Sequence, residues 1–340
     1  PLGIPSIDDK LVQEVIRMLL EAIYEDSFEE ISHGFRPNRS CHTALRQIQN
    51  RFVRCKWYVE GDIKGFFDNI DHEIMINILR KRIKDERFIN LIRKFLNAGY
   101  MEQQELHQSY SGTPQGGIIS PILANIYLDQ FDKYMAEYKK QFDLGKKRAY
   151  NREYAKMADT RHRLLVKLNN SENQEEKIYF LNQIKELDKI HRTMPCKEPM
   201  DSNFKRLQYV RYCDDFIIGI IGSKEDAKKV KKEIGQFIQN KLHLELSNEK
   251  TLITKATNKA RFLGFDIRVT PKSNLTKKTK RGIKARNYSG HVMLEVPTEL
   301  IQKKLIELKA MKIVVNNNTE IWKPIHRGDL TGRKDLSILD

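Results

Sequence analysis

The stretch Leu207–Gly222, LQYVRYCDDFIIGIIG, constrains the fold of this 340-residue chain more than any other feature. Its β-branched and aromatic side chains predict two strands, at 207–212 and 216–221, joined by a turn. Two adjacent carboxylates, Asp214 and Asp215, interrupt the apolar run at that turn. Ionised carboxylates are costly to bury unpaired. Two interpretations remain open from this stretch: a solvent-exposed acidic tip, or a metal site at the tip of a buried hairpin.

The charge balance favours a polyanionic partner. The chain has 61 Lys and Arg against 45 Asp and Glu, a formal net charge of +16, which favours nucleic acid as the first candidate. No apolar run approaches the roughly 20 residues of a membrane span, and the first residues lack the pattern of a signal peptide, so we expect no membrane partner. The four cysteines form no C-x-x-C pair, which argues against zinc and disulfide frameworks and predicts a reducing, cytoplasmic setting.

The order of predicted elements is that of an α+β protein. The elements are a strand at 56–63, a helix that Asp71 caps, a helix at 120–142, the two strands of the hairpin, a helix at 223–241 and a strand at 242–247. This order fits the ferredoxin-like split βαβ plan with an antiparallel sheet. In that plan the end of the first strand lies beside the central hairpin, so we expect Asp62 to meet Asp214.

Apolar residues recur at helical spacing in two long segments. In residues 8–30 the stripe is Leu11, Val15, Met18, Leu19, Ala22 and Ile23. In the 120–142 helix, Ser120 is the predicted N-cap and Pro121 the first helical residue. The stripe of this second helix is expected to be core, and comprises Ile122, Ile126, Tyr127, Phe131, Tyr134, Met135 and Tyr138.

Two basic or charged segments interrupt or follow this plan. Residues 139–203 are rich in Lys, Arg, Glu and Asn and predict an inserted helical hairpin, with helices near 150–168 and 172–192. A solvated charged arm and an RNA contact are equally good interpretations of it. Between the expected strands RFLGFDIRV and HVMLEV, residues 268–286 contain no acid. We interpret them as a phosphate-contacting hairpin rather than a solvated loop. Its basic residues are Arg268, Lys272, Lys277, Lys278, Lys280, Arg281, Lys284 and Arg286.

Six sequence motifs stand in the order of a polymerase. Polymerase motif A is similar to YVEGDIKGFFDNIDH, motif B in its intron-encoded form to SGTPQGGIISPILANIYLDQFD, and motif C to YCDDF. Motif D resembles LHLELSNEKT, motif E resembles RFLGFDI, and the fingers signature resembles the N-terminal segment with GFRPNRSCHTAL. Six in order, over about residues 1–270, are a strong signal. The chain therefore resembles the group II intron-encoded reverse transcriptases, the intron maturases.

The resemblance implies the fingers and palm of a right-hand polymerase, with a split βαβ palm and a helical insertion. The implied domains are fingers at 1–55 with parts of 85–110, palm at 56–84 and 111–138, the insertion at 139–203, palm with the catalytic hairpin at 204–267, and a basic hairpin and linker towards a thumb at 268–340. We expect a fingers–palm fragment, without the N-terminal extension and the thumb or maturase domain, which predicts weak activity for this piece alone. No H-N-H endonuclease signature is present.

Nucleotide addition needs a more nucleophilic 3′-oxygen and a stabilised triphosphate, and two Mg²⁺ ions supply both. Mg²⁺ prefers oxygen ligands such as carboxylates. The predicted catalytic and metal-binding residues are Asp62, Asp214 and Asp215, and by the resemblance the Ile63 carbonyl is a further ligand. The two ions are expected to bind together with the dNTP substrate.

The resemblance also implies residues that contact the nucleotide. Phe67 would be the steric gate against a ribose 2′-OH, although a core aromatic remains the alternative. Gln115 and Gly116 would line the nucleotide pocket, in a loop that also suits a glycine-rich helix entry. Arg36 and Arg39 are predicted triphosphate contacts, since guanidinium groups match phosphate geometry. For Arg39, a capping role or a contact with the template backbone is an equally good interpretation.

Lys250 resembles the lysine of motif D that protonates the leaving pyrophosphate, with a simple surface lysine as the alternative. Cys213 is interpreted as a small packing residue, since no nearby His supports a nucleophile.

The predicted function is thus an RNA-directed DNA polymerase of a group II intron maturase, which also binds intron RNA in splicing and mobility. The expected partners are group II intron RNA, an RNA template and a DNA primer, and a homodimer is left open. One alternative is an RNA-binding maturase module whose splicing role needs no polymerase activity. Another is a different bacterial reverse transcriptase lineage.

Overall fold

The computed structural model describes most of the chain as two compact units. The described residues are 6–98, 100–102, 105–107, 111–113, 117–198, 200–271, 276–278, 284–286, 290–316 and 319–325. The larger unit comprises residues 1–263 and 267–294, and the smaller one residues 264–266 and 295–340. In the smaller unit, helix α9 (Thr298–Glu307) precedes an antiparallel hairpin of β12 (Met311–Asn316) and β13 (Thr319–Pro324).

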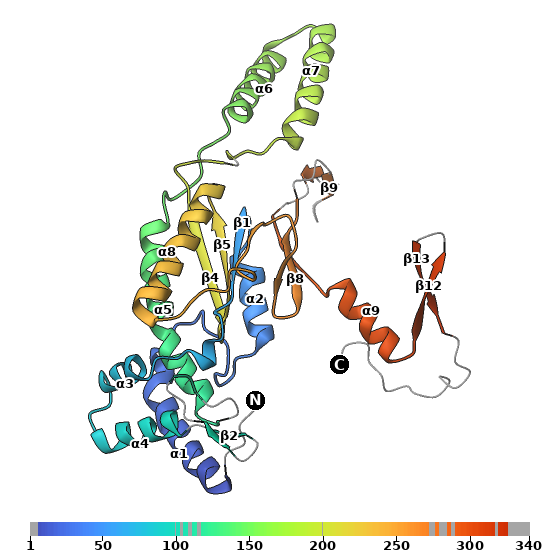
Figure 1. The fold of residues 1–340 in the computed structure, drawn as a ribbon. Helices are drawn as coiled ribbons and strands as arrows, with labels where there is room; N and C mark the ends of the chain where they lie inside the picture. The colour runs from blue at the N-terminus through green and yellow to red at the C-terminus, as the bar shows by residue number, and fades with distance from the viewer. Residues whose placement is uncertain are drawn as a thin grey trace. The chain divides into compact units, whose positions relative to one another are not determined.

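A four-stranded antiparallel sheet forms the centre of the larger unit (Figure 1). Its strands lie in the order β4 (Arg206–Tyr212), β5 (Asp215–Ile221), β1 (Trp57–Gly61) and β6 (Ile253–Lys255). The predicted hairpin is confirmed as β4 and β5, and β1 pairs along the other edge of β5.

One predicted strand, at 242–247, is wrong. Helix α8 (Lys224–Leu242) runs into this segment, and the chain leaves it through His243, which has a φ of +50°. The segment then makes only an isolated bridge, Ile63↔Leu246, and the fourth strand of the sheet forms later, as β6.

Helices cover both faces of this sheet. Helices α5 (Ser120–Phe142) and α8 pack on one face, and α2 (Cys41–Arg51) packs on the other (Figure 1). Because side chains alternate along a strand, Ile218 and Ile220 of β5 join the core under α5 and α8. Gly219 faces the other way, and a Cβ there would lie 2.7 Å from side-chain atoms of Phe52 and Cys55.

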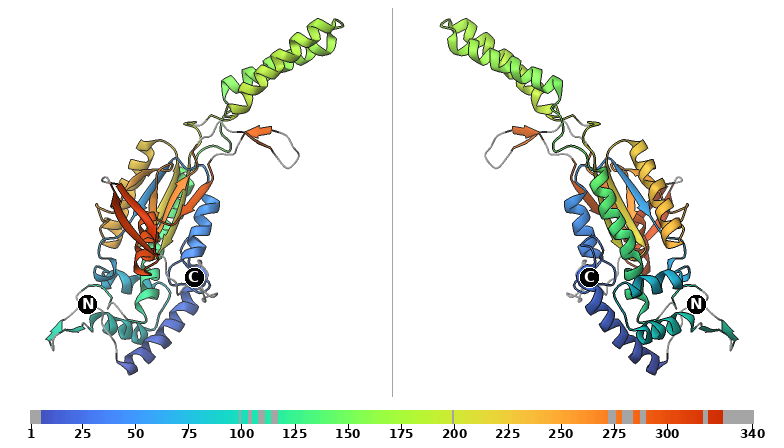
Figure 2. Two further views of the ribbon diagram at one scale, coloured as in Figure 1. Left: turned by 90° about the vertical axis from the view of Figure 1, so that its right-hand side faces the viewer. Right: turned by 90° about the vertical axis from the view of Figure 1, so that its left-hand side faces the viewer.

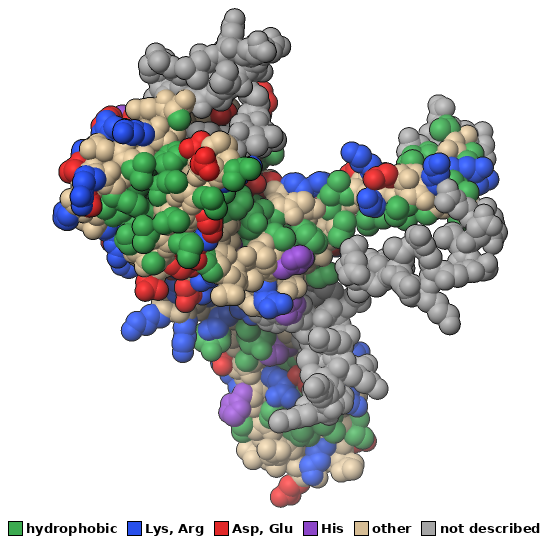
Figure 3. Space-filling model, turned by 90° about the horizontal axis from the view of Figure 1, so that it is seen from below, with side chains coloured by type: hydrophobic (Ala, Val, Ile, Leu, Met, Phe, Trp, Pro, Cys, Tyr) green, Lys and Arg blue, Asp and Glu red, His purple; other side chains and the backbone are tan. Residues whose placement is uncertain are grey.

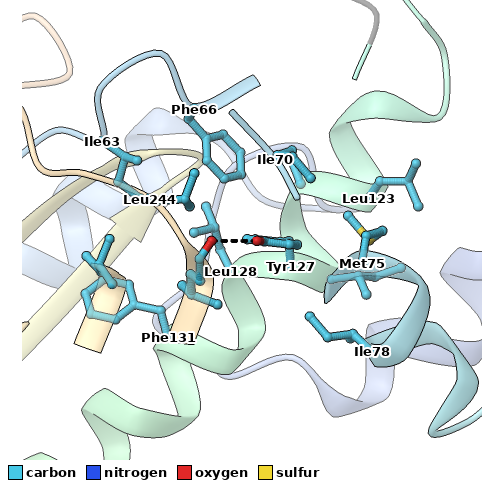
Figure 4. Close-up of a cluster of buried hydrophobic side chains, with 14 of the residues drawn as sticks. Ile63, Phe66, Ile70, Met75, Ile78, Leu123, Tyr127, Leu128, Phe131 and Leu244 are labelled. Carbon is cyan, nitrogen blue, oxygen red and sulfur yellow. Dashed lines mark hydrogen bonds between the residues drawn. The ribbon is translucent and has the colours of Figure 1, made fainter. Parts of the chain in front are cut away.

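The main hydrophobic core lies against α5. Figure 4 shows Phe66, Tyr127 and Phe131 within it, and the Tyr127 hydroxyl donates to the Leu242 carbonyl at 2.6 Å. Full burial of such a side chain stabilises the fold by roughly 1.5–3 kcal/mol. The predicted core stripe of α5 is confirmed, with Tyr134 and Tyr138 only half-buried against the core. Helix α5 begins at Ser120 with Ile119 as N-cap, so the predicted cap at Ser120 is wrong by one residue.

Helix α1 (Ile7–Tyr24) buries Ile16, Leu20 and Tyr24. The large residues of the stripe that predicted this helix are instead between 36% and 64% exposed, and they are Leu11, Val15, Met18, Leu19 and Ile23. Figure 3 shows the larger unit from below, the side on which α1 lies in Figure 1, with hydrophobic side chains gathered on that face. The helix is confirmed, but apolar residues lie on most of its surface, so periodicity did not identify the buried side.

The other elements before α9 are short, apart from the insertion described below. They are η1 (Glu25–Ser27), η2 (Phe66–Asp68), α3 (His72–Arg80), α4 (Glu86–Asn97), β2 (Tyr100–Glu102), β3 (Glu105–His107), β7 (Ala260–Phe262), β8 (Phe265–Val269), β9 (Thr276–Lys278), β10 (Lys284–Arg286) and β11 (Val292–Glu295). Asp71 caps α3 as predicted. The single strand expected from RFLGFDIRV is wrong, because Leu263 and Gly264 have positive φ and split it into β7 and β8.

The helical hairpin predicted within 139–203 is confirmed as two helices, α6 (Arg152–Asn170) and α7 (Gln174–Thr193). Figure 2 shows them packed side by side. At the base of this helical pair, Leu144 and Lys205 exchange backbone hydrogen bonds of 3.0 and 3.1 Å. Across the described residues, no helix is both long and apolar enough to cross a membrane.

Candidate active site

The β4–β5 hairpin turns through Cys213 and Asp214, directly after Tyr212 pairs with Asp215. Two-residue turns of this kind need backbone angles that favour glycine. Cys213 takes this role with a φ of +56° and is itself buried. The turn therefore presents Asp214 and Asp215, both half-buried, at one end of the sheet.

Asp62 follows directly on β1, whose last residue, Gly61, pairs with Phe216. One step further, the same register sets Asp62 opposite Asp215, close enough for the charge of Asp62 to act on Asp215. A Cβ on Gly61 would lie 2.1 Å from the Phe216 ring, so only glycine permits this approach. The structure thus brings together Asp62, Asp214 and Asp215, which we call the carboxylate site.

Burial and mutual repulsion together characterise the carboxylate site. Burial, and then the charges of Asp214 and Asp62, raise the pKa of Asp215 to about 6. Lys250 approaches from the solvent, with Nζ 3.2 Å from Asp62 Oδ2, and this hydrogen bond raises the pKa of Lys250. One exposed lysine does not balance three carboxylates, so the site carries an excess of negative charge.

The backbone beside Asp62 offers one more oxygen. The Asp62 carbonyl accepts from Ser247 N–H at 2.8 Å, and Lys64 N–H donates to the Glu245 carbonyl at 2.9 Å. Because successive peptide groups of a strand point to opposite edges, the Ile63 carbonyl points to the edge that faces β5. Such carboxylate and carbonyl oxygens suit Mg²⁺. Among the residues with described positions, however, no group of three or more His, Cys, Asp or Glu side chains is arranged as metal ligands.

Phe67 lies in η2, half-buried, with its ring 5.2 Å from that of Phe66 in an edge-on contact. The start of the SGTPQGG loop lies against this segment. Gly112 has a φ of +86°, and a Cβ there would lie 2.6 Å from the Phe67 carbonyl oxygen. The loop and Phe67 are therefore neighbours. The predicted nucleotide contacts Gln115 and Gly116 lie outside the described residues.

The two predicted triphosphate contacts differ in their surroundings. The Arg36 side chain is only 4% exposed, pairs with Glu25 at 2.7 Å and donates to the Glu29 carbonyl at 2.8 Å. Its guanidinium is engaged within the protein, which argues against the predicted clamp. Arg39 is half-buried and donates from Nη1 to the Glu30 carbonyl at 2.8 Å, and its nucleotide contact stays a prediction.

The hairpin predicted within 268–286 forms from β9 and β10, with Lys278 opposite Lys284. The predicted phosphate contacts that lie on these strands are Lys277, Lys278, Lys284 and Arg286. Lys280 and Arg281 lie outside the described residues. Phosphate binding by this hairpin stays a prediction.

Sequence reasoning missed a buried polar cluster directly below the turn. We call it the arginine cluster; its members are Ser32, Asn125, Asp132 and Arg211, none more than 1% exposed. Arg211 reaches the turn itself, donating from Nη1 to the Cys213 carbonyl at 2.8 Å. The available signal was a charged residue inside the apolar strand, together with an amide and an acid inside the apolar stretch of α5.

Comparison with known proteins relates the chain to reverse transcriptases. A family profile described as reverse transcriptase (RNA-dependent DNA polymerase) matches residues 1–150. The chain is 46% identical over 339 residues to the group II intron-encoded protein LtrA of Lactococcus lactis subsp. cremoris, covering 100% of this chain and 55% of that protein. It is 42% identical to an uncharacterized 91 kDa protein in the cob intron of Schizosaccharomyces pombe, covering 98% and 40%. The chain thus spans about half the length of the curated relatives it matches.

Among solved structures, apo telomerase from Candida tropicalis is similar with a TM-score of 0.45 at 14% identity, over 76% of this chain and 39% of that one. A likeness of this size carries no argument about fold or function.

Proposed function

This chain belongs to the reverse transcriptases that group II introns encode, and we propose that it carries the RNA-directed DNA polymerase of an intron maturase. It adds deoxynucleotides to a DNA primer along an RNA template, and binds group II intron RNA to assist splicing and mobility. The observation that carries this proposal is the carboxylate site at one end of the sheet, where Asp62 directly follows β1, Asp214 lies in the β4–β5 turn and Asp215 begins β5.

We assign the larger unit to the fingers and palm of a right-hand polymerase. The strand order β4–β5–β1–β6, with α8 between β5 and β6, fits the split βαβ plan of a palm. The proposed boundaries are fingers at 1–55 with parts of 85–110, palm at 56–84, 111–138 and 204–267, and the helical insertion at 139–203. The basic hairpin and a linker towards a thumb follow at 268–340.

The donor set fits Mg²⁺, and two ions bound with the dNTP would activate the primer 3′-oxygen and stabilise the triphosphate. Asp62, Asp214 and Asp215 would hold these ions, with the Ile63 carbonyl as a further ligand. Their arrangement on two paired strands and a tight turn limits the movement of the carboxylates, which favours a fixed reaction geometry.

Other residues select and orient the nucleotide. Phe67 excludes a ribose 2′-OH, supported by its half-buried ring beside the SGTPQGG loop. Gln115 and Gly116 line the nucleotide pocket, and Arg39 contacts the triphosphate. Lys250 donates a proton from Nζ to the leaving pyrophosphate, which requires it to leave Asp62.

The proposed partners are group II intron RNA, an RNA template and a DNA primer, in the cytoplasm. The net charge of +16 and the basic β9–β10 hairpin support a polyanionic partner.

The test is primer extension on an RNA template, with and without Mg²⁺. Asp214→Ala is expected to abolish Mg²⁺-dependent extension, whereas Glu225→Ala, at an exposed position in the first turn of α8, is the control and leaves it intact. Full extension by the Asp214→Ala variant would contradict the assignment of the site.

A second candidate is an RNA-binding maturase whose splicing role needs no polymerase activity. The charged helical pair α6–α7 and the basic hairpin favour it. Splicing of the intron RNA in the presence of Asp214→Ala separates the two roles. Assistance that survives the substitution, with RNA binding that weakens steeply with salt, supports this candidate, and assistance lost together with extension contradicts it.

A further inference from the structure

Arg211 lies in β4, and its side chain and that of Asp132 on α5 are both 0% exposed. Nε and Nη2 form a bidentate pair with the carboxylate, at 2.8 and 2.6 Å. A buried ion pair of this kind adds little net stability compared with apolar residues of the same volume. The other groups that the guanidinium binds are therefore more informative about its role.

The remaining donors of Arg211 reach three different segments of the chain. Nη1 donates to the Cys213 carbonyl at 2.8 Å and to Asn125 Oδ1 at 3.2 Å, and Nη2 donates to Ser32 Oγ at 2.7 Å. Together with the two bonds to Asp132, every N–H of the guanidinium has a partner. A lysine ammonium, with three donors on a flexible stem, does not reproduce this planar set.

The same cluster joins the turn to the loop before Phe35. The Arg211 backbone accepts from His33 N–H at 3.0 Å and donates to the Ile31 carbonyl at 2.9 Å. Asn125 Nδ2, in turn, donates to the Gly34 carbonyl at 2.8 Å. The loop, the turn and α5 are therefore bonded to one another around the buried Arg211.

Gly34 completes this contact by its lack of a side chain. A Cβ at Gly34 would lie 2.4 Å from the backbone nitrogen of Cys213 and 3.1 Å from its Cα. Since those atoms belong to the backbone of the turn, only a shift of the loop or of the turn would make room. The turn that carries Asp214 is thus fixed from two sides, by a hydrogen bond and by direct backbone contact.

We propose that Arg211 is a positioning residue for the carboxylate site: it fixes the turn that carries Asp214 and Asp215 and joins that turn to the Gly34 loop. This inference rests on the proposed polymerase function. Arg211 is fully buried, and it acts on the turn through the carbonyl of Cys213 rather than on substrate.

Two variants test the role, each with a matched control. Arg211→Lys removes part of the cluster, and its control is Arg206→Lys on the same strand, where the side chain bonds the Leu144 and Gly145 carbonyls instead. Gly34→Ala moves the turn without removing a buried charge. Its control is Gly235→Ala on α8, where a Cβ meets only Leu246 at 3.6 Å. If Arg211→Lys does not fold, Gly34→Ala decides.

The readouts separate positioning from folding. In single-turnover extension, normalised to active sites, we expect both variants to lower the rate at saturating nucleotide by about ten- to a hundredfold, with primer–template KM unchanged and both controls near wild type. In the metal-free protein, amide exchange of residues 207–222 is expected to rise in both variants, while that of α8 stays unchanged.

Rates within twofold of wild type, or unchanged exchange at the turn, would overturn the inference. Loss of active sites with a normal rate per site would also overturn it, because that pattern indicates folding alone. If the wild-type chain extends no primer at all, rather than extending it weakly, the polymerase proposal fails instead, and amide exchange then decides the role of Arg211 by itself.

Discussion

Two groups of charged residues meet at the turn of the β4–β5 hairpin, and one has its charges balanced while the other has an excess of negative charge. In the arginine cluster every donor of Arg211 has a partner and water is excluded. In the carboxylate site three acids face one exposed lysine, and the pKa of Asp215 is raised to about 6. The first arrangement is satisfied and fixes a geometry. The second is left with an excess of negative charge, which the proposed metal ions would relieve.

The largest expected effect comes from removing one acid of the carboxylate site. Asp62→Asn should lower primer extension at least about a thousandfold, since metal ions contribute several kcal/mol to such transition states. The free energy of unfolding of the Asp62→Asn variant should not fall, because the substitution removes repulsion between carboxylates. Urea unfolding checks the second point, and a strongly destabilised variant would contradict the contrast between the two groups.

The arginine cluster should respond in the opposite way. Asp132→Ala leaves the Arg211 charge buried without its carboxylate and should lower the free energy of unfolding by about 3–5 kcal/mol. Glu137→Ala, on the same helix in an exposed pair with Lys140, should change it by no more than about 0.5 kcal/mol. If thermal or urea unfolding shows equal losses of unfolding free energy in these two variants, the distinction between the buried cluster and an exposed ion pair is contradicted.

The pH dependence of the carboxylate site follows from Asp215. Its folded-state pKa of about 6 lies above the ordinary value of 3.8, so the folded protein holds this proton more tightly than the unfolded chain. The metal-free protein should therefore gain stability as the pH falls through 6 towards 4, and lose it as the pH rises. Asp215→Asn should flatten this part of the profile, and an unchanged slope in the variant would count against the assignment.

A smaller effect is expected at Lys250, whose side chain is 70% exposed. Lys250→Met removes a positive charge beside Asp62 and should tighten Mn²⁺ binding by up to about fivefold at low salt. The gain should shrink as ionic strength rises. Titration followed by electron paramagnetic resonance measures both, and unchanged or weaker binding would show that Lys250 does not compete with the cation.

The sequence predicted the carboxylate site but not the arginine cluster, for a physical reason. Alternation and element order are enough to set Asp62 beside the Asp214–Asp215 turn, because antiparallel register follows from local pattern. Arg211 lies inside an apolar strand, and the role of a charge there cannot be predicted until its partner is known. That partner, Asp132, is 79 positions away, on a helix whose apolar stripe predicts only packing in the core.

Similar limits explain the other differences. Arg36 was a reasonable phosphate ligand by residue type, but the nearby Glu25 takes its guanidinium. In α1, apolar residues lie on several faces, so the buried side depended on tertiary packing. The strand expected at 242–247 failed because α8 extends to Leu242.

The most direct test of the carboxylate site is to locate the ions. Crystals of the chain with RNA template, DNA primer and a non-hydrolysable dNTP, soaked in Mn²⁺, give anomalous peaks at bound metal. We predict two peaks, ligated by Asp62, Asp214 and Asp215 with the Ile63 carbonyl and the triphosphate, both absent in Asp214→Ala. A bound dNTP with no anomalous peak at these carboxylates would contradict the account.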